Sequence, residues 1–217
     1  EVLAIEHGAR PAARTAGGRV RASAVLLAGN AYQRLETRRL SGQVFPAGSY
    51  IIATEPLCEE QAQEINPLDM AFCDPNHVLD YFRLSVDRRL LFGGRCNYSG
   101  RVPSSIRGSI EPRMHKVFPQ LRTTRIDYEW GGNVGIVINR VPLLGRLHGN
   151  VYYALGYSGH GVNMTHAAGE ILADAIGGTL ERLDLFERVG HWRIPFGQAM
   201  GGQLVALGML YYRLRDW

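Results

Sequence analysis

Three glycines within six residues mark the stretch of this sequence that is best suited to binding chemistry. The stretch covers residues 156–161 and reads GYSGHG, between a short apolar run at 151–155 and a segment with helical spacing. The glycines let the backbone turn tightly and let a ligand approach it without meeting a Cβ atom. A strand, a glycine turn and a helix N-terminus bind anions, because the first helical N–H groups are unpaired and carry partial positive charge. The pattern therefore predicts an anion site, with a plain tight turn as the equally weighted alternative.

The elements around this turn are predicted from hydrophobic periodicity. The β-branched, aromatic and apolar residues at 151–155 are typical of a buried strand. One face of the following helix carries apolar residues at helical spacing, and Gly177 and Gly178 end it. These apolar residues are Met164, Ala168, Ile171, Leu172 and Ala175.

Composition limits the function classes. The 217 residues are 46% hydrophobic and 20% charged, as in an ordinary globular protein of one or two domains. The net charge of +4 comes from scattered arginines without a basic stripe, so nucleic-acid binding is not expected. Cys58, Cys73 and Cys96 show no metal-binding spacing, which favours free thiols in a reducing cytoplasm. No apolar run is long enough to span a bilayer, and no signal peptide is seen.

The sequence of the glycine turn and the following helical segment resembles a known flavin-binding motif. GYSGHGVNMTHAAGEILADAI at 156–176 is similar to the C-terminal motif of the D-amino-acid oxidase/glycine oxidase family of FAD-dependent amine oxidoreductases. WGGNVGIVINRVPLLGRL at 130–147 and GMLYYRLRDW at 208–217 extend the resemblance along nearly the whole chain. It is greatest to the bacterial members that act on γ-glutamylputrescine. These enzymes oxidise an amine to an imine by hydride transfer to the flavin, and the imine then hydrolyses to an aldehyde.

The resemblance implies an α/β (α+β) fold made of two kinds of domain. The C-terminal part of an FAD-binding Rossmann-like domain would cover residues 1–39 and 129–217, and an inserted antiparallel-sheet substrate domain would cover 40–128. A complete family member has a G-x-G-x-x-G fingerprint, which this sequence lacks, and the chain starts at Glu1 without a methionine. We therefore expect a C-terminal piece that is inactive alone and that self-associates through uncovered apolar faces.

Further elements are expected along the chain from local patterns. Strands are predicted at 1–9, 18–22, 25–32 (ending in a glycine turn), 38–56, 80–85, 90–94 and 125–131. Helical segments are predicted at 59–64, 106–118, 183–189 and 203–213, with a loop at 191–196. The helix at 106–118 would place Ile106, Ile110, Met114 and Val117 on one face.

The family motif implies a set of cofactor-binding residues at the strand ends. In the family the turn packs against the isoalloxazine ring, and the helix directs its N-terminus at the pyrimidine edge. The cofactor-binding residues expected from the match are Gly29, Gly156, Ser158, Gly159, His160, Gly161, Val162 and Asn163. Asn163 and Thr165 would bond the pyrimidine edge or else satisfy the first helical turn.

Flavin amine oxidation needs positioning residues rather than a catalytic triad. The catalytic candidates are His160, Trp130 and Tyr157. His160 would bond the flavin ring or tune substrate protonation, or else only shape the loop, whereas His166 is expected to be a packed structural histidine. Trp130 and Tyr157 would line an aromatic pocket. Tyr50 and Tyr81 would line the same pocket or, more simply, are core residues.

Two absences in the sequence bear on substrate and cofactor. Glycine oxidase-like relatives hold the substrate carboxylate with an arginine before the proline equivalent to Pro142, whereas residues 130–135 here contain none. This favours an alkylamine such as γ-glutamylputrescine over an α-amino acid. No cysteine follows Cys96, so the FAD is expected to be noncovalent. The alternatives are a D-amino-acid, glycine or sarcosine oxidase or dehydrogenase, or an inactive binding module.

Overall fold

The structure is a computed structural model that describes residues 1–76, 79–97 and 103–194. The described residues form two compact units. Unit 1 contains residues 1–46 and 134–194, and unit 2 contains the described part of residues 47–133. The mixed α/β class expected from the sequence is confirmed. None of the helices in the described part of the chain combines the length and apolar character needed to cross a bilayer.

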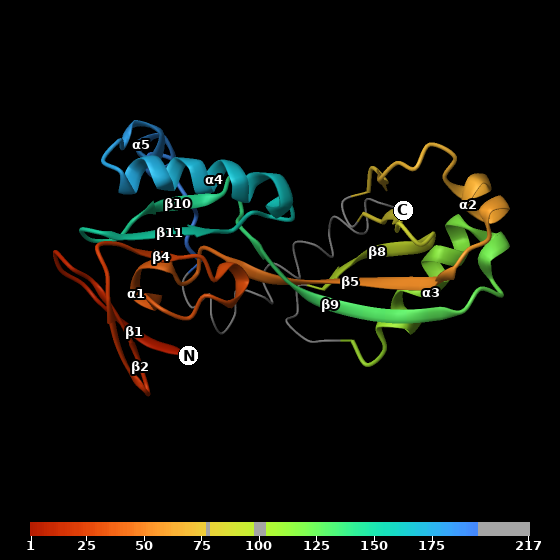
Figure 1. Cartoon of the computed structure of the whole chain (residues 1–217), viewed down its shortest axis with the longest axis horizontal. Helices are drawn as coiled ribbons and strands as arrows, with labels where there is room; N and C mark the ends of the chain where they lie inside the picture. Colours follow the sequence, from red (N-terminus) through yellow and green to blue (C-terminus); the bar gives the residue numbers. More distant parts are fainter. Residues whose placement is uncertain (77–78, 98–102, 195–217) are drawn as a thin grey trace. The chain divides into compact units, whose positions relative to one another are not determined.

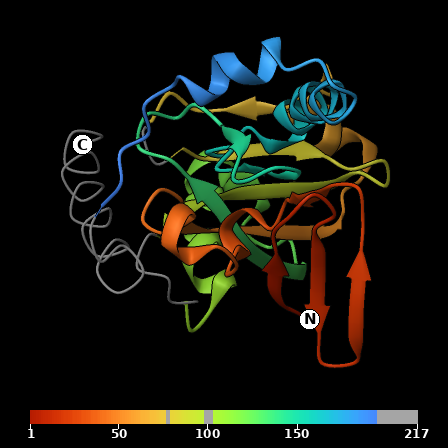
Figure 2. The same cartoon turned by 90° about the vertical axis from the view of Figure 1, so that its left-hand side faces the viewer.

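Unit 1 contains two three-stranded sheets. β1 (Val2–Glu6), β2 (Ala12–Thr15) and β3 (Gly18–Arg21) form an antiparallel meander, seen in red in Figure 2. The second sheet has the order β10 (Leu143–Arg146), β11 (Val151–Leu155), β4 (Val25–Leu27). β11 is antiparallel to β10 and parallel to β4. The carboxyl ends of β4 and β11 therefore lie at the same edge of this sheet.

Helix α4 (Gly161–Ile176) covers the second sheet of unit 1 (Figure 1). Its buried residues Ala168, Ile171 and Leu172 pack with Leu144 and Tyr152 of the sheet. This is the apolar face that helical spacing predicts, and Gly178 follows the helix at a positive φ of 106°. α5 (Glu181–Glu187) adds Leu183 to the same core. α1 (Thr37–Leu40) and the 3₁₀ turn η1 (Asn30–Tyr32) complete unit 1.

Unit 2 is built on a five-stranded sheet. The order is β6 (Phe72–Cys73), β7 (Tyr81–Leu84), β8 (Arg89–Asn97), β5 (Phe45–Pro56), β9 (Ile126–Ile136). The β6–β7, β7–β8 and β8–β5 pairs are antiparallel. The unit boundaries fall within β5 and β9.

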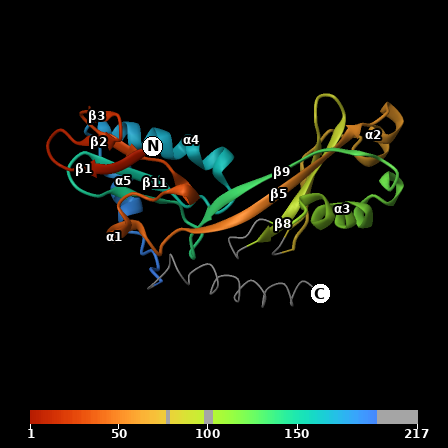
Figure 3. The same ribbon diagram turned by 90° about the horizontal axis from the view of Figure 1, so that it is seen from below.

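Three helical segments pack beside the long strands of this sheet, as Figure 3 shows for the first two of them. They are α2 (Glu59–Ile65), α3 (Ile106–Val117) and the 3₁₀ turn η2 (Pro119–Leu121). Ile110 and Met114 of α3 are fully buried against Leu90 and Phe92 of β8. A core between one sheet face and α3 therefore holds unit 2 together.

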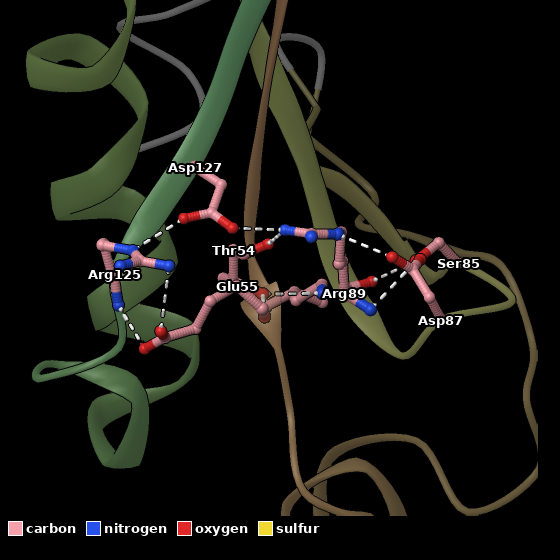
Figure 4. A network of polar contacts seen from close by, with 8 residues as sticks. Thr54, Glu55, Ser85, Asp87, Arg89, Arg125 and Asp127 are labelled. Atoms are coloured by element: carbon pink, nitrogen blue, oxygen red, sulfur yellow. Dashed lines mark hydrogen bonds and ion pairs between the residues drawn. The ribbon is translucent and has the colours of Figure 1, made fainter.

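Ion pairs also tie three strands of unit 2 (Figure 4). Arg89 on β8 bonds Asp127 on β9 at 2.6 Å and the carbonyl oxygen of Thr54 on β5 at 2.9 Å. Arg89 also pairs with Asp87 at 2.7 Å, and Arg125 pairs with Asp127 at 2.7 Å. The hydrogen bond from Arg89, followed by that from Arg125, lowers the pKa of the Asp127 carboxyl below its ordinary value.

Several element boundaries differ from the sequence-based expectations. Residues 38–40 belong to α1 rather than to a strand, because Leu40 is buried in the core of unit 1. The apolar face of α3 continues to Phe118, which is buried, whereas Val117 is exposed, since 110, 114 and 118 follow a spacing of four. The short strands β2, β6 and β10 had no clear alternating pattern and were not predicted. The segment 203–213, and 195–196 of the predicted loop, lie outside the described residues.

Candidate functional site

The turn between β11 and α4 adopts a backbone that explains its glycines. Gly156 and Gly159 have positive φ values of 71° and 92°, and Ser158 between them also has a positive φ of 54°. A left-handed conformation costs an ordinary L-residue about 1–2 kcal/mol. Contacts to other segments must therefore hold Ser158 in place.

Ser158 is fixed by hydrogen bonds to the end of β9. Its N–H donates to the carbonyl oxygen of Gly135 at 2.8 Å, and its Oγ accepts from the N–H of Val137 at 3.1 Å. The Ser158 hydroxyl lies 3.3 Å from the carbonyl oxygen of Gly156, to which it donates. The residue is buried, so its side chain stabilises the turn from inside unit 1. The buried Ser158 side chain thus shapes the turn, and its predicted part in cofactor binding would be indirect.

Asn30 fixes the other end of the same turn. The N–H of Gly156 donates to Asn30 Oδ1 at 2.9 Å, although the two residues are 126 positions apart. A Cβ atom on Gly135 would lie 2.2 Å from the same oxygen. Sequence reasoning missed both Asn30 and Gly135. Asn30 could have been found as an asparagine directly after a strand and a glycine, a place where its tolerance of positive φ is useful.

The N-terminus of α4 carries no side-chain cap. The N-cap residue is His160, whose side chain makes no capping bond, and the first turn contains no acidic residue. Val162 is 90% exposed, and a Cβ on Gly159 would have nothing within 4 Å among the described residues. The start of α4 therefore presents backbone N–H donors and the positive end of the helix dipole to an accessible surface.

The other residues predicted around this helix start differ in exposure. His160 and Asn163 are exposed. Thr165 donates its hydroxyl to the carbonyl oxygen of Gly161 at 2.6 Å, so it serves the helix itself. His166 is exposed and not packed as expected, because it lies on the face of α4 away from the buried Ala168, Ile171 and Leu172.

Gly29 follows β4, whereas Tyr157 lies within the turn before α4, and the two residues differ in exposure. Gly29 is exposed at an ordinary φ of −72°, as N-cap of η1. Tyr157 is buried in the core with Leu144 and Tyr152, and this burial raises the pKa of its phenol. The burial favours a packing contribution for Tyr157.

The aromatic candidates of unit 2 lie on its sheet. Trp130 on β9 is 43% exposed, and Tyr50 is buried in the core of unit 2 as predicted. Tyr81 is half-buried, and its hydroxyl lies 2.9 Å from Ser49 Oγ. Segment 130–135 is the carboxyl-terminal part of β9, with half-buried Asn133 and no arginine.

The residues at the start of α4 fit a flavin. The pyrimidine edge of flavin is rich in hydrogen-bond acceptors and becomes negatively charged on reduction, so uncapped N–H donors and a helix dipole suit it. The donors are the N–H groups of Gly161, Val162 and Asn163, and Gly159 leaves open space beside them. A carboxylate in the first turn would oppose such a ligand, and the turn has none.

Comparisons with known proteins show the family of the chain. A family profile described as "FAD dependent oxidoreductase" matches residues 1–175. The chain is 41% identical over 217 residues to "Gamma-glutamylputrescine oxidoreductase" of Escherichia coli, covering 99% of this chain and 51% of that protein. It is 38% identical over 207 residues to "Probable oxidoreductase OrdL" of Haemophilus influenzae, covering 94% and 47%.

A solved structure shows the same fold at low sequence identity. Glycine oxidase from Geobacillus kaustophilus superposes with a TM-score of 0.67 at 20% identity, covering 82% of this chain and 48% of that one. The chain thus spans about half the length of the curated relatives it matches. Because the family profile covers most of the sequence, the chain belongs to the FAD dependent oxidoreductase family.

Proposed function

We propose that this chain supplies the flavin-contacting turn and the substrate-binding sheet of an amine oxidoreductase that acts on γ-glutamylputrescine or a similar alkylamine. The observation that carries the proposal is the 41% identity along 99% of the chain to the Escherichia coli gamma-glutamylputrescine oxidoreductase. In the proposed reaction the amine loses a hydride from carbon and a proton from nitrogen, and water then hydrolyses the imine to an aldehyde with release of ammonia or an amine. Bound FAD supplies the two-electron acceptor.

Unit 1 contains the residues proposed to hold the cofactor. The turn formed by Gly156, Ser158, Gly159 and His160 brings the chain to the start of α4 with no Cβ at its two glycines. The N–H groups of residues 161–163 offer donors to the acceptor-rich edge of the ring. Gly29 lies at the end of the neighbouring parallel strand β4 and belongs to the same proposed set. FAD is proposed to bind noncovalently, since no cysteine follows Cys96.

Unit 2 is proposed to supply substrate-binding residues, with Trp130 the leading candidate. Its partly exposed indole on β9 can pack along an alkyl chain or lie near a cationic nitrogen. The substrate class rests on the missing arginine in 130–135. Without a guanidinium at this place, an α-carboxylate gains no bidentate pair.

The deciding experiment is an anaerobic titration of the full-length, flavin-bound protein with a panel of amines. The readout is bleaching of the visible flavin absorption. We expect γ-glutamylputrescine to bleach it, whereas glycine, sarcosine and D-alanine should not at the same concentration.

Each outcome of the titration has a definite meaning. Bleaching by the amino acids but not by γ-glutamylputrescine would overturn the substrate assignment and place the protein among amino-acid oxidases. A full-length protein that binds no flavin at all would overturn the proposed function. Dioxygen and a quinone are then added separately to the reduced protein to identify the electron acceptor.

A further inference from the structure

Asn30 joins three segments of unit 1 that are far apart in the sequence. It follows β4, and its Oδ1 accepts the N–H of Gly156 after β11 at 2.9 Å. The same side chain lies against Gly135 near the end of β9, where a Cβ would come within 2.2 Å of Oδ1 and 3.0 Å of Cγ. Gly135 in turn accepts the N–H of Ser158 at 2.8 Å. The amide of Asn30 thus sits at the centre of the contacts that shape the turn before α4.

The residue type at position 30 is suited to this place for two physical reasons. Asn30 has a φ of 46°, and asparagine is among the few side chains that adopt this region readily. Its short amide also offers an acceptor close to its own backbone. Glycine would accept the backbone conformation but provide no acceptor, whereas alanine would provide neither.

The bond to Gly156 fixes the direction of the following peptides. Gly156 has a φ of 71°, and a Cβ there would lie 2.4 Å from Val137 Cγ1, so the turn has little space for an alternative path. With the first N–H of the turn held by Asn30 and that of Ser158 held by Gly135, the direction in which α4 starts is set. We propose that Asn30 is a positioning residue that aligns the start of α4 for the flavin. This inference rests on the proposed function.

The test compares Asn30→Gly with Asn30→Asp in the full-length protein. Asn30→Gly keeps the backbone conformation and removes the acceptor. Asn30→Asp retains an acceptor oxygen and a side chain that tolerates positive φ. The matched control is Asp69→Gly, an exposed short polar residue of unit 2 with a nearly equal φ of 47°.

Two properties of the bound flavin are measured. One is the dissociation constant of FAD, from quenching of flavin fluorescence on adding it to apoprotein. The other is the midpoint potential of the bound flavin, which a purely structural role would leave unchanged. We expect Asn30→Gly to weaken FAD binding about tenfold, on the scale of one hydrogen bond, and to shift the potential. Asn30→Asp should bind FAD more tightly than Asn30→Gly because it keeps the acceptor, and Asp69→Gly should match wild type in both measurements.

A double-mutant cycle with Gly135→Ala tests the contact itself. The new Cβ would collide with Asn30 Oδ1, so Gly135→Ala alone should reproduce the effect of Asn30→Gly on FAD affinity. In the Asn30→Gly background most of that collision is removed, and the second substitution should add little. The remaining neighbour, Val44 Cγ1 at 2.9 Å, belongs to a side chain that can shift.

The outcomes separate this inference from the function on which it rests. If wild type binds FAD and reacts with amines while Asn30→Gly retains wild-type affinity and potential, the inference is wrong and the function stands. Additive effects in the double-mutant cycle would also contradict it. If wild type binds no FAD, the proposed function has failed first.

Discussion

His160 is the residue at the proposed flavin site whose side chain is most free to act. Its backbone is already used, because its N–H donates to the carbonyl oxygen of Tyr157 at 2.9 Å and its carbonyl oxygen accepts from Met164 at 3.1 Å. Its ring makes no cap bond and is exposed. The imidazole is therefore not needed to hold the turn, which favours a role toward ligand over a role in shaping the loop.

Replacing His160 separates these two roles. We expect His160→Gln to slow anaerobic bleaching by the preferred amine by about tenfold if His160 supplies a hydrogen bond, and by about a hundredfold or more if it transfers a proton. The free energy of unfolding should change little, because the side chain is exposed. Stopped-flow absorption and denaturant titration measure the two quantities.

The matched control for His160 is His166→Gln. His166 is exposed on the same helix but about 1.7 turns further along, beyond the helix start. The flavin of His166→Gln should be bleached by the preferred amine at the wild-type rate. Equal rates for both variants and wild type would show that His160 does not take part in the reaction.

At the scale of elements, α4 combines a face that packs on the sheet with a first turn that can bind a ligand. Its buried face, with Ala168, Ile171 and Leu172, holds the helix against the sheet of unit 1. Its uncapped first turn leaves N–H donors and positive dipole charge available. Packing is thus supplied by the middle of the helix, while its start remains available for a ligand.

Val162→Asp tests whether the start of α4 is available for a ligand. A carboxylate in the first turn should stabilise the fold but disfavour reduction of a bound flavin. Without flavin, the negative charge beside the positive end of the dipole should stabilise the protein by about 0.3–1 kcal/mol. With flavin bound, the same charge should oppose electron uptake and lower the midpoint potential. Denaturant titration of the apoprotein and potentiometry of the flavin-bound protein measure the two effects.

Val162→Asn serves as the uncharged comparison. It changes the same 90% exposed side chain without adding charge. The free energy of unfolding and the midpoint potential should therefore change less than in Val162→Asp. An unchanged potential in Val162→Asp, with FAD still bound, would place the flavin away from the start of α4.

At the scale of the whole molecule, each unit has its own apolar core. Unit 2 packs α3 against β8, and its ion pairs tie β8, β5 and β9 together. Because Arg89 and Arg125 lower the pKa of Asp127, this carboxylate contributes stability above its unfolded-state pKa, near 3.8. The contribution is lost as the pH falls through the lower pKa of the folded state.

Asp127→Asn should therefore change the acid response of the chain. We expect the variant to be less stable than wild type at neutral pH, with the difference shrinking below about pH 4 as wild-type Asp127 takes up its proton. Urea unfolding at a series of pH values measures this.

Asp87→Asn is the comparison for Asp127→Asn. Asp87 contacts a single arginine and its side chain is 59% exposed, so its substitution should have the smaller effect. A loss in Asp127→Asn that is constant at every pH would contradict an electrostatic origin.

The sequence by itself determined the family, the mixed α/β class, the strand–turn–helix unit at 151–176 and the buried face of α4. These follow from local periodicity and from a motif whose residues are consecutive, so no distant contact is needed to recognise them. Element ends were predictable only within a few residues, as the start of α5 at Glu181 and the end of α3 at Val117 show.

Only the tertiary structure decided which side chains hold the turn before α4 and which face outward. Asn30 and Gly156 are 126 positions apart, and they meet because β4 and β11 pair in parallel and end at one edge of the sheet. The same folding buries Tyr157 and leaves His160 and His166 exposed. Burial and long-range hydrogen bonds depend on how strands pair, and local residue spacing does not specify that pairing.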